Sequence, residues 1–226
     1  MIDQEPRVRA TLPIEFFPTL ETIPDVTHGF VGRVPGVDVR VERDQALRRL
    51  DSCHQMAIED LGLAPYRLIV GEQIHGREVA VVDSRTPSPV AGVDGLITAD
   101  AGVCLGVYVA DCCAVYLIEP ARQVIGLLHS GRKGSELGIA TAAIERICTE
   151  FHCDPAKIIV QLSPCIRPPN YEIDFAAAIV AQCRAGGVRQ IHDCGTCTAA
   201  HPDHYYSYRL ERGKTGRMLA LLALNT

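Results

Sequence analysis

The sequence predicts an α+β fold in which helices and a mixed β-sheet form one layered sandwich, with residues 1–226 as a single domain. Two observations support this prediction. Apolar runs of strand length alternate with segments of helical periodicity through the middle of the chain, which is typical of layered architectures rather than of barrels or bundles. A chain of 226 residues with 47% apolar residues can also bury one large core.

Each expected element rests on its own pattern. Helices are expected where apolar residues recur every three or four positions, at 45–61, 135–151 and 175–185. Buried strands are expected at short apolar runs, at 68–70, 79–82, 103–109, 114–118, 124–129 and 158–162. The last stretch predicts a strand at 205–209, then a charged turn and a closing apolar element that reaches residue 224.

Composition limits the classes of partner. The formal net charge of −5 argues against nucleic acid or an anionic membrane surface as a partner, and leaves a small molecule or a protein. Residues 1–13 contain no continuous apolar run, so they resemble neither a signal peptide nor a membrane span, and we expect a cytoplasmic protein. The sequence gives no indication of the oligomeric state.

Ten cysteines are too sparse for a small disulfide scaffold. Cys104, Cys148 and Cys183 lie within apolar runs and are expected to be buried thiols. The other cysteines are better considered as metal ligands or reactive groups than as disulfide partners.

Three side chains that can bind metal lie at the end of an apolar strand or in the loop that follows one. They are His75, Cys112 and His129. Imidazole and thiolate are good zinc ligands, and three protein ligands with one open position are typical of catalytic zinc. The spacing alone does not bring the three together, since each residue on its own is more often a core or loop residue.

The segment Ser130-Gly131-Arg132-Lys133-Gly134 connects an expected strand to an expected helix. Its cations and the helix N-terminus can hold an anion such as phosphate beside His129. The alternative is an ordinary turn whose glycines serve only its geometry.

Asp111 precedes Cys112 directly. Three roles are open to its carboxylate: it can orient a ligand histidine, accept a proton, or cap a turn.

Cys194 and Cys197 form a C-x-x-C pair, with His201 and His204 shortly after it. The spacing suits a closed zinc site or a redox dithiol, but the ligand pairs are too close together for a zinc finger. A surface loop with unused ligands is favoured.

Taken together, these segments resemble the YfiH family, also called the laccase-domain or multicopper polyphenol oxidoreductase family. The family's motifs recur in order from residue 73 to the C-terminus: Gln73-Ile74-His75-Gly76, Val93-Asp94-Gly95-Leu96-Ile97-Thr98, Ala110-Asp111-Cys112, His129-Ser130-Gly131-Arg132-Lys133-Gly134, Cys197-Thr198, Tyr206-Ser207-Tyr208-Arg209 and Thr215-Gly216-Arg217. His28-Gly29-Phe30 with Arg33 resembles a further family segment whose arginine helps to form the pocket.

The resemblance implies that His75, Cys112 and His129 bind Zn²⁺ and form the catalytic centre. From its position before Cys112, we expect Asp111 to be a further catalytic residue. The expected substrate contacts come from several of these segments, including the 130–134 turn and the C-terminal stretch. They are Arg33, Gln73, Arg132, Lys133, Tyr206 and Arg209. The sequence departs from the family pattern at Arg132 in place of tryptophan, at Ala114 in place of proline, and in a shortened loop at 34–37.

The resemblance implies phosphorolysis of adenosine, inosine, guanosine and methylthioadenosine, with adenosine deamination as a further activity. One alternative is a zinc amide hydrolase that removes a wrong amino acid from UDP-muramyl peptidoglycan precursors. Another is a non-catalytic binding or redox-regulatory protein that acts through Cys194 and Cys197. Multicopper oxidation is disfavoured, because that chemistry normally uses about ten histidines in H-x-H pairs, whereas this chain has eight histidines and no such pair.

Overall fold

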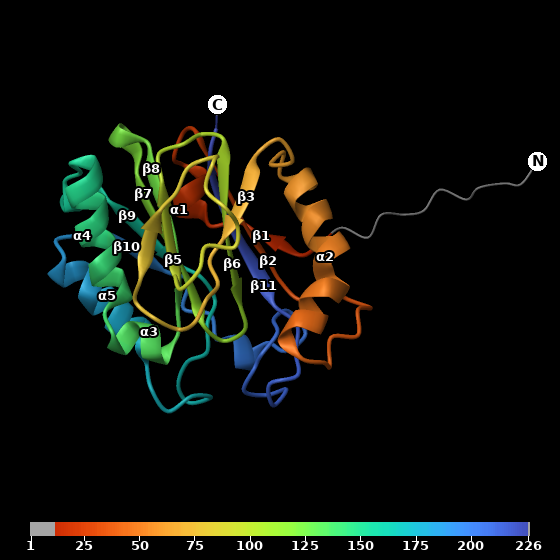
Figure 1. The fold of residues 1–226 in the computed structure, drawn as a ribbon. Coiled ribbons are helices and arrows are strands. Elements are labelled where there is room, and N and C mark those ends of the chain that lie inside the picture. Colours follow the sequence, from red (N-terminus) through yellow and green to blue (C-terminus); the bar gives the residue numbers. More distant parts are fainter. Residues whose placement is uncertain (1–11, 226) are drawn as a thin grey trace, which may run out of the picture.

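The computed structural model describes residues 12–225. Within this range, two mixed β-sheets pack face to face and helices cover both outer faces, which gives four layers (Figure 1). The predicted α+β layered sandwich is confirmed, with two sheets where the sequence predicted one. Most of the 1–13 segment, for which we expected neither a signal peptide nor a membrane span, lies outside the described residues.

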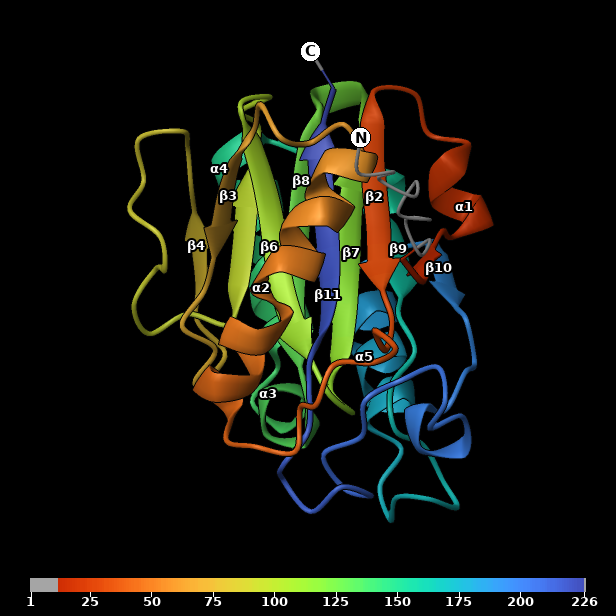
Figure 2. The ribbon, with the colours of Figure 1, turned by 90° about the vertical axis from the view of Figure 1, so that its right-hand side faces the viewer.

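The first sheet has the strand order β1-β2-β11-β6-β3. Its strands are β1 (Ile14–Glu15), β2 (Val26–Val31), β3 (Arg67–Val70), β6 (Val103–Val109) and β11 (Met218–Leu224). Only the β3–β6 pair is parallel. Every residue of β11 is buried, because the second sheet covers one of its faces and the helix α2 the other (Figure 2).

The second sheet has the strand order β10-β9-β7-β8-β5-β4. Its strands are β4 (Val79–Val81), β5 (Gly95–Thr98), β7 (Cys113–Glu119), β8 (Val124–Ser130), β9 (Ile159–Leu162) and β10 (Gln190–Asp193). The antiparallel strands β5, β8 and β7 lie side by side in its centre.

The helices divide between the two outer faces. They are α1 (Pro18–Glu21), α2 (Arg43–Asp60), α3 (Arg132–Glu136), α4 (Ile139–Phe151) and α5 (Phe175–Ala185), with 3-10 turns η1 (Pro120–Arg122), η2 (Pro155–Lys157) and η3 (Thr198–Ala200). Helix α2 lies across the first sheet, and α4 and α5 cover the second (Figures 1 and 2). Within the described residues, no helix is both long and apolar enough to cross a lipid bilayer.

Strand β7 shows how the two cores form. Alternate side chains point to opposite faces of a strand, so Ala114, Tyr116 and Ile118 enter the core between the sheets. The intervening Val115 and Leu117 enter the core beneath α4 and α5. The fully buried Tyr116 hydroxyl donates to the Gly29 carbonyl oxygen of the facing sheet at 3.0 Å, which satisfies both polar groups.

The predicted helices at 45–61 and 175–185 are confirmed as α2 and α5. The single helix predicted at 135–151 is wrong in one respect, because α3 and α4 are separate. Gly138 lies between them with φ +80°, a conformation that interrupts a right-handed helix and that glycine adopts without strain.

The predicted strand at 205–209 is also wrong. Its backbone N–H groups donate to side chains instead of to a neighbouring strand: Tyr206 N–H to Met218 Sδ, Ser207 N–H to Glu211, and Arg209 N–H to Asp111. The predicted closing apolar element is confirmed as β11. The sequence reasoning missed β2, because His28 and Gly29 interrupt its apolar run, and it missed the short strands β1, β5 and β10.

Candidate metal centre and its cavity

His75, Cys112 and His129 meet at one end of the sheet sandwich. Their ligand atoms all lie within 4.8 Å of one another, and no other group of three such residues within 12–225 meets in this way. The two imidazole rings meet edge to face at an angle of 77°, with centroids 4.7 Å apart. Two imidazoles and a thiolate at this separation fit one divalent ion with a coordination position left open.

The register of the second sheet explains how these residues converge. Cys113 at the start of β7 pairs with Ser130 at the end of β8, so Cys112 lies next to Gly131. A Cβ atom at Gly131 would lie 2.5 Å from the Cys112 sulfur, so any larger residue there would displace the thiol. Gly95 of β5 pairs with Leu128 in the same way, which places Asp94 beside His129.

Asp94 connects two of the three ligands, His129 and the loop that carries His75. Its buried carboxylate accepts hydrogen bonds from the backbone N–H groups of Ile74, His75 and Gly76 at 3.1, 2.9 and 2.7 Å. The same carboxylate lies 2.8 Å from Nδ1 of His129, which leaves Nε2 of that ring for a metal. One side chain thus fixes the loop that carries His75 and the orientation of His129.

The backbone at the site is strained. Gln73, His75 and Asp111 have φ values of +62°, +61° and +76°, which non-glycine residues rarely adopt. The three hydrogen bonds to Asp94 and the two between the Gln73 amide and the Tyr108 backbone hold the 73–76 loop in this conformation.

The charges of the site are coupled. Burial opposes ionisation of the Cys112 thiol, but the neighbouring His129, with a further hydrogen bond from His75, lowers its pKa to about 6. Burial also opposes the charged form of His129, but the Cys112 thiolate and the Asp94 carboxylate raise its pKa to about 9. Although burial disfavours the ionised Asp94, His129 and the backbone N–H groups hold its pKa below the ordinary value.

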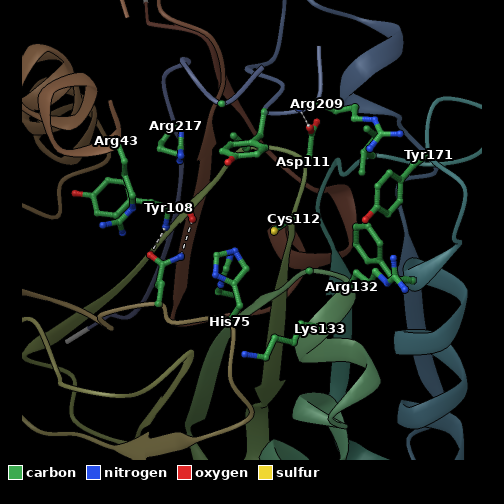
Figure 3. Close-up of a pocket in the computed structure, with 18 of the residues that line it drawn as sticks. Arg43, His75, Tyr108, Asp111, Cys112, Arg132, Lys133, Tyr171, Arg209 and Arg217 are labelled. Atoms are coloured by element: carbon green, nitrogen blue, oxygen red, sulfur yellow. Dashed lines mark hydrogen bonds between the residues drawn. The ribbon is translucent and has the colours of Figure 1, made fainter. Parts of the chain in front are cut away.

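The three ligands lie in a cavity of about 1080 Å³. Figure 3 shows His75 and Cys112 near its centre. On one side of them lie Arg43, Tyr108 and Arg217, and on the other side lie Arg132, Tyr171 and Arg209. The cavity wall therefore carries aromatic rings and several cations, although the whole chain has a net charge of −5.

None of the hydrogen bonds of Asp111 within the described residues reaches a ligand histidine, and Asp94 is the carboxylate that contacts His129. The buried Asp111 carboxylate accepts hydrogen bonds from the hydroxyls of Thr198 and Ser207 at 2.7 and 3.0 Å, and from the Arg209 N–H at 2.7 Å. These hydrogen bonds hold the loops of Thr198, Ser207 and Arg209 in place, which is closest to the turn-capping role considered for Asp111. Proton transfer by Asp111 stays a prediction.

The other predicted contacts fall into two groups. Gln73, Arg132, Lys133 and Arg209 line the cavity. Arg33 and Tyr206 are not among its lining residues, because the Arg33 guanidinium stacks on the Tyr206 ring at 4.5 Å and pairs with Glu211 at 2.7 Å. Contact of these two residues with a substrate stays a prediction.

The departures from the family pattern have local explanations. Arg132 is exposed and pairs with Glu136 at 2.9 Å. The Ala114 N–H, which a proline would lack, donates to Ser163 Oγ at 2.9 Å. In the shortened loop, the Val34 N–H donates to the Tyr206 hydroxyl at 3.0 Å.

The second cysteine cluster does not gather its ligands. Cys194, Cys197, His201 and His204 form no group that can hold a metal within the described part of the chain. All ten cysteines are free thiols. Cys197 accepts a hydrogen bond from the Arg167 N–H, as a loop residue would.

Sequence reasoning missed Asp94, Arg43, Tyr108, Tyr171 and Arg217 as parts of the site. Asp94 and Arg217 lie within motifs that resemble those of the family, but the resemblance implied no role for either residue. No sequence signal indicated that Arg43, at the start of α2, or Tyr171 faces the cavity.

The chain is similar to proteins of known sequence and structure. It matches the profile of a family described as multi-copper polyphenol oxidoreductase laccase over residues 36–178 and 171–225. A Streptomyces coelicolor protein named purine nucleoside phosphorylase is 32% identical over 198 residues, which cover 76% of this chain and 81% of that protein. The protein YlmD of Geobacillus stearothermophilus, also named purine nucleoside phosphorylase, is 30% identical over 196 residues, or 69% of this chain and 72% of YlmD.

Two crystal structures share the fold. YlmD from Geobacillus stearothermophilus superposes with a TM-score of 0.76 and 25% identity, over 90% of this chain and 93% of that chain. A hypothetical protein YfiH from Bacillus licheniformis gives a TM-score of 0.80 at 21% identity, over 91% and 95% of the two chains. This second similarity concerns the fold alone.

We predict that Asp94→Asn weakens metal binding by about 10- to 100-fold, because an amide cannot accept all four hydrogen bonds that the carboxylate accepts. The free energy of unfolding of the metal-free protein should fall by about 1–3 kcal/mol. Competition with a chromogenic chelator and urea denaturation measure the two effects. Asp100→Asn is the matched control, since Asp100 also accepts two backbone N–H bonds, from Ser84 and Gly102. Equal metal affinity in wild type and Asp94→Asn would show that Asp94 does not orient the ligands.

We predict that chelator-treated protein is alkylated at Cys112 with a half-maximal rate near pH 6, because the thiolate is the reactive form and the pKa of this thiol is lowered to about 6. Reactivity should therefore rise as the pH increases through 6, and a divalent metal should suppress it. Iodoacetamide labelling followed by peptide mass spectrometry measures each site. Cys148 is the internal control, because burial raises the pKa of its thiol. A Cys112 profile no lower in pH than that of Cys148 would refute the proposed charge coupling.

Proposed function

The chain belongs to the multi-copper polyphenol oxidoreductase laccase family, and from this premise we propose that it is a zinc-dependent purine nucleoside phosphorylase. The observation that carries the proposal is the convergence of His75, Cys112 and His129 in a large cationic cavity. The names of the relatives from Streptomyces coelicolor and Geobacillus stearothermophilus support the same activity.

The donor set favours zinc over the copper sites of an oxidase. One thiolate and two imidazoles, with Asp94 holding His129, match a catalytic zinc site with a free position. Multicopper oxidases need several copper sites, whereas the described residues form one cluster of three ligands. A bound zinc ion would supply a Lewis acid that polarises a substrate oxygen at the open position.

The cavity has the components that a nucleoside and phosphate require. Tyr171 on its wall offers an aromatic face for a planar purine ring. Its arginines and Lys133 offer charge-assisted hydrogen bonds to phosphate oxygens. Asp111 would act as a positioning residue, because it fixes the loop that carries Arg209.

In the proposed reaction, a phosphate oxygen attacks the anomeric carbon of the ribose. The bond from this carbon to the purine nitrogen breaks, and the electron pair leaves with the base, which takes up a proton. The products are the free purine and ribose 1-phosphate. The chain contributes by holding the two substrates close together and by balancing the charge of phosphate with its cations.

The cysteines are consistent with a cytoplasmic location, which is part of the proposal. All ten are free thiols, as expected for a protein kept in a reducing compartment.

We predict that the purified protein converts adenosine to adenine and ribose 1-phosphate only when inorganic phosphate is present. Inosine, guanosine and methylthioadenosine should react in the same way. His75→Ala should lower the rate at least about a hundredfold, since the ion then loses one of its ligands. Liquid chromatography of the base and nucleoside measures each product, and Asp100→Asn serves as the folded control.

Other products would redirect the proposal. Inosine formed from adenosine without any need for phosphate would identify a deaminase instead. No product from any of the four nucleosides would contradict the proposal and favour the amide hydrolase, which release of an amino acid from a UDP-muramyl precursor would test.

A further inference from the structure

Arg217 carries a buried charge that forms no ion pair with a carboxylate of the described residues. The residue is 8% exposed and lines the cavity. None of the ion pairs among residues 12–225 includes it. An unpaired buried cation is unfavourable, so its presence at a cavity wall indicates an anion that binds there.

The guanidinium of Arg217 is held in a fixed direction. Its Nη1 donates to the carbonyl oxygens of Thr215 and Gly216 at 2.9 and 2.8 Å, and its carbon lies 5.9 Å from the centre of the Tyr208 ring. No hydrogen bond within the described residues uses Nε or Nη2. These two groups are the parallel donors that bind two oxygens of one phosphoryl group.

Arg43 adds a second charge on the same wall. It lies beside Arg217 and Tyr108 in the cavity (Figure 3). Among the described residues, its one carboxylate partner is the exposed Asp44 at 3.7 Å. Burial and the positive charge of Arg43 lower the pKa of Arg217, against the opposing charges of Cys112 and Asp111. Glu42 also lines the cavity but makes no ion pair with either arginine. Two like charges are thus held together where an anion would relieve their repulsion.

The two arginines of the opposite wall are already paired. Arg132 forms an ion pair with Glu136 at 2.9 Å, and Arg209 with Glu172 at 3.3 Å. The turn at 130–134, for which phosphate binding was one of two alternatives, leads into α3, a helix of five residues. Its remaining cation, Lys133, is exposed to solvent.

We propose that Arg217 and Arg43 form the site for a phosphoryl oxyanion, and that inorganic phosphate occupies it during phosphorolysis. The inference rests on the proposed function and assigns the phosphate to the wall of Arg43 and Tyr108. The phosphate oxygen that attacks the anomeric carbon would then approach from the wall of Arg43 and Tyr108. The purine would leave toward the wall of Tyr171 and Arg132.

The test compares Arg217→Gln, Arg43→Gln and Lys133→Gln in the full-length, metal-loaded protein. Phosphorus NMR titration with inorganic phosphate measures binding directly, and initial rates give the KM values for phosphate and for adenosine. Both arginine variants should weaken phosphate binding by roughly 10- to 100-fold while the KM for adenosine stays close to that of wild type. Lys133→Gln should have a smaller effect on phosphate.

Further variants make the test specific. Arg217→Lys keeps the charge but loses the paired donors, and should recover only part of the affinity. Arg85→Gln, which removes an exposed arginine outside the cavity, should leave phosphate binding unchanged. If circular dichroism shows that Arg217→Gln does not fold, Arg43→Gln decides the test, because Arg43 is partly exposed at the first residue of α2.

The outcomes separate this inference from the proposed function. Phosphate binding that depends on Arg217 and Arg43, without cleavage of any nucleoside, would support the anion site and refute the phosphorylase. Phosphorolysis with an unchanged KM for phosphate in both arginine variants would overturn the anion site. A site that binds adenosine 5′-monophosphate but not inorganic phosphate would also overturn the assignment, since the anion would then belong to the substrate.

Discussion

The site depends on the hydrogen bonds that the Asp94 carboxylate accepts. This carboxylate accepts hydrogen bonds from three consecutive N–H groups of the loop that carries His75, and it contacts His129 on the neighbouring strand. The loop has an unfavourable backbone conformation at Gln73 and His75, and these bonds offset the strain. A network of this kind preorganises ligands before a metal arrives. The second sheet places the remaining ligand, because the pairing of β7 with β8 brings Cys112 close to His129.

The electrostatics of the cavity differ from those of the whole molecule. The net charge of −5 argues against long anionic polymers as partners, yet the cavity wall is rich in arginine and lysine. The two observations are compatible, because a small anion responds to the charges within a few ångströms, whereas a polymer responds to a whole face. The buried Arg217 is therefore more informative than the net charge about the class of ligand.

The sequence predicted those features that depend on local pattern. The helical periodicity at 45–61 and 175–185 and the apolar run at 103–109 correspond to α2, α5 and β6, because packing and propensity agree there. Spacing could not bring His75 to Cys112 and His129, since that depends on the register of distant strands; only the family resemblance implied it. The strand predicted at 205–209 does not form, because the side chains of Glu211 and Asp111 accept the backbone N–H groups of Ser207 and Arg209. Asp111 is distant in the sequence, so the local pattern could not indicate this contact. Arg43 and Tyr171 reach the cavity through tertiary packing, which has no sequence signature.

Metal analysis combined with X-ray absorption tests the central claim most directly, on protein purified without chelator or added metal. The account predicts one zinc ion per chain with one sulfur and two imidazole nitrogens among its ligands, and loss of that ion in Cys112→Ala. Zinc that is retained when both Cys112 and His129 are replaced, or several copper ions per chain, would contradict it.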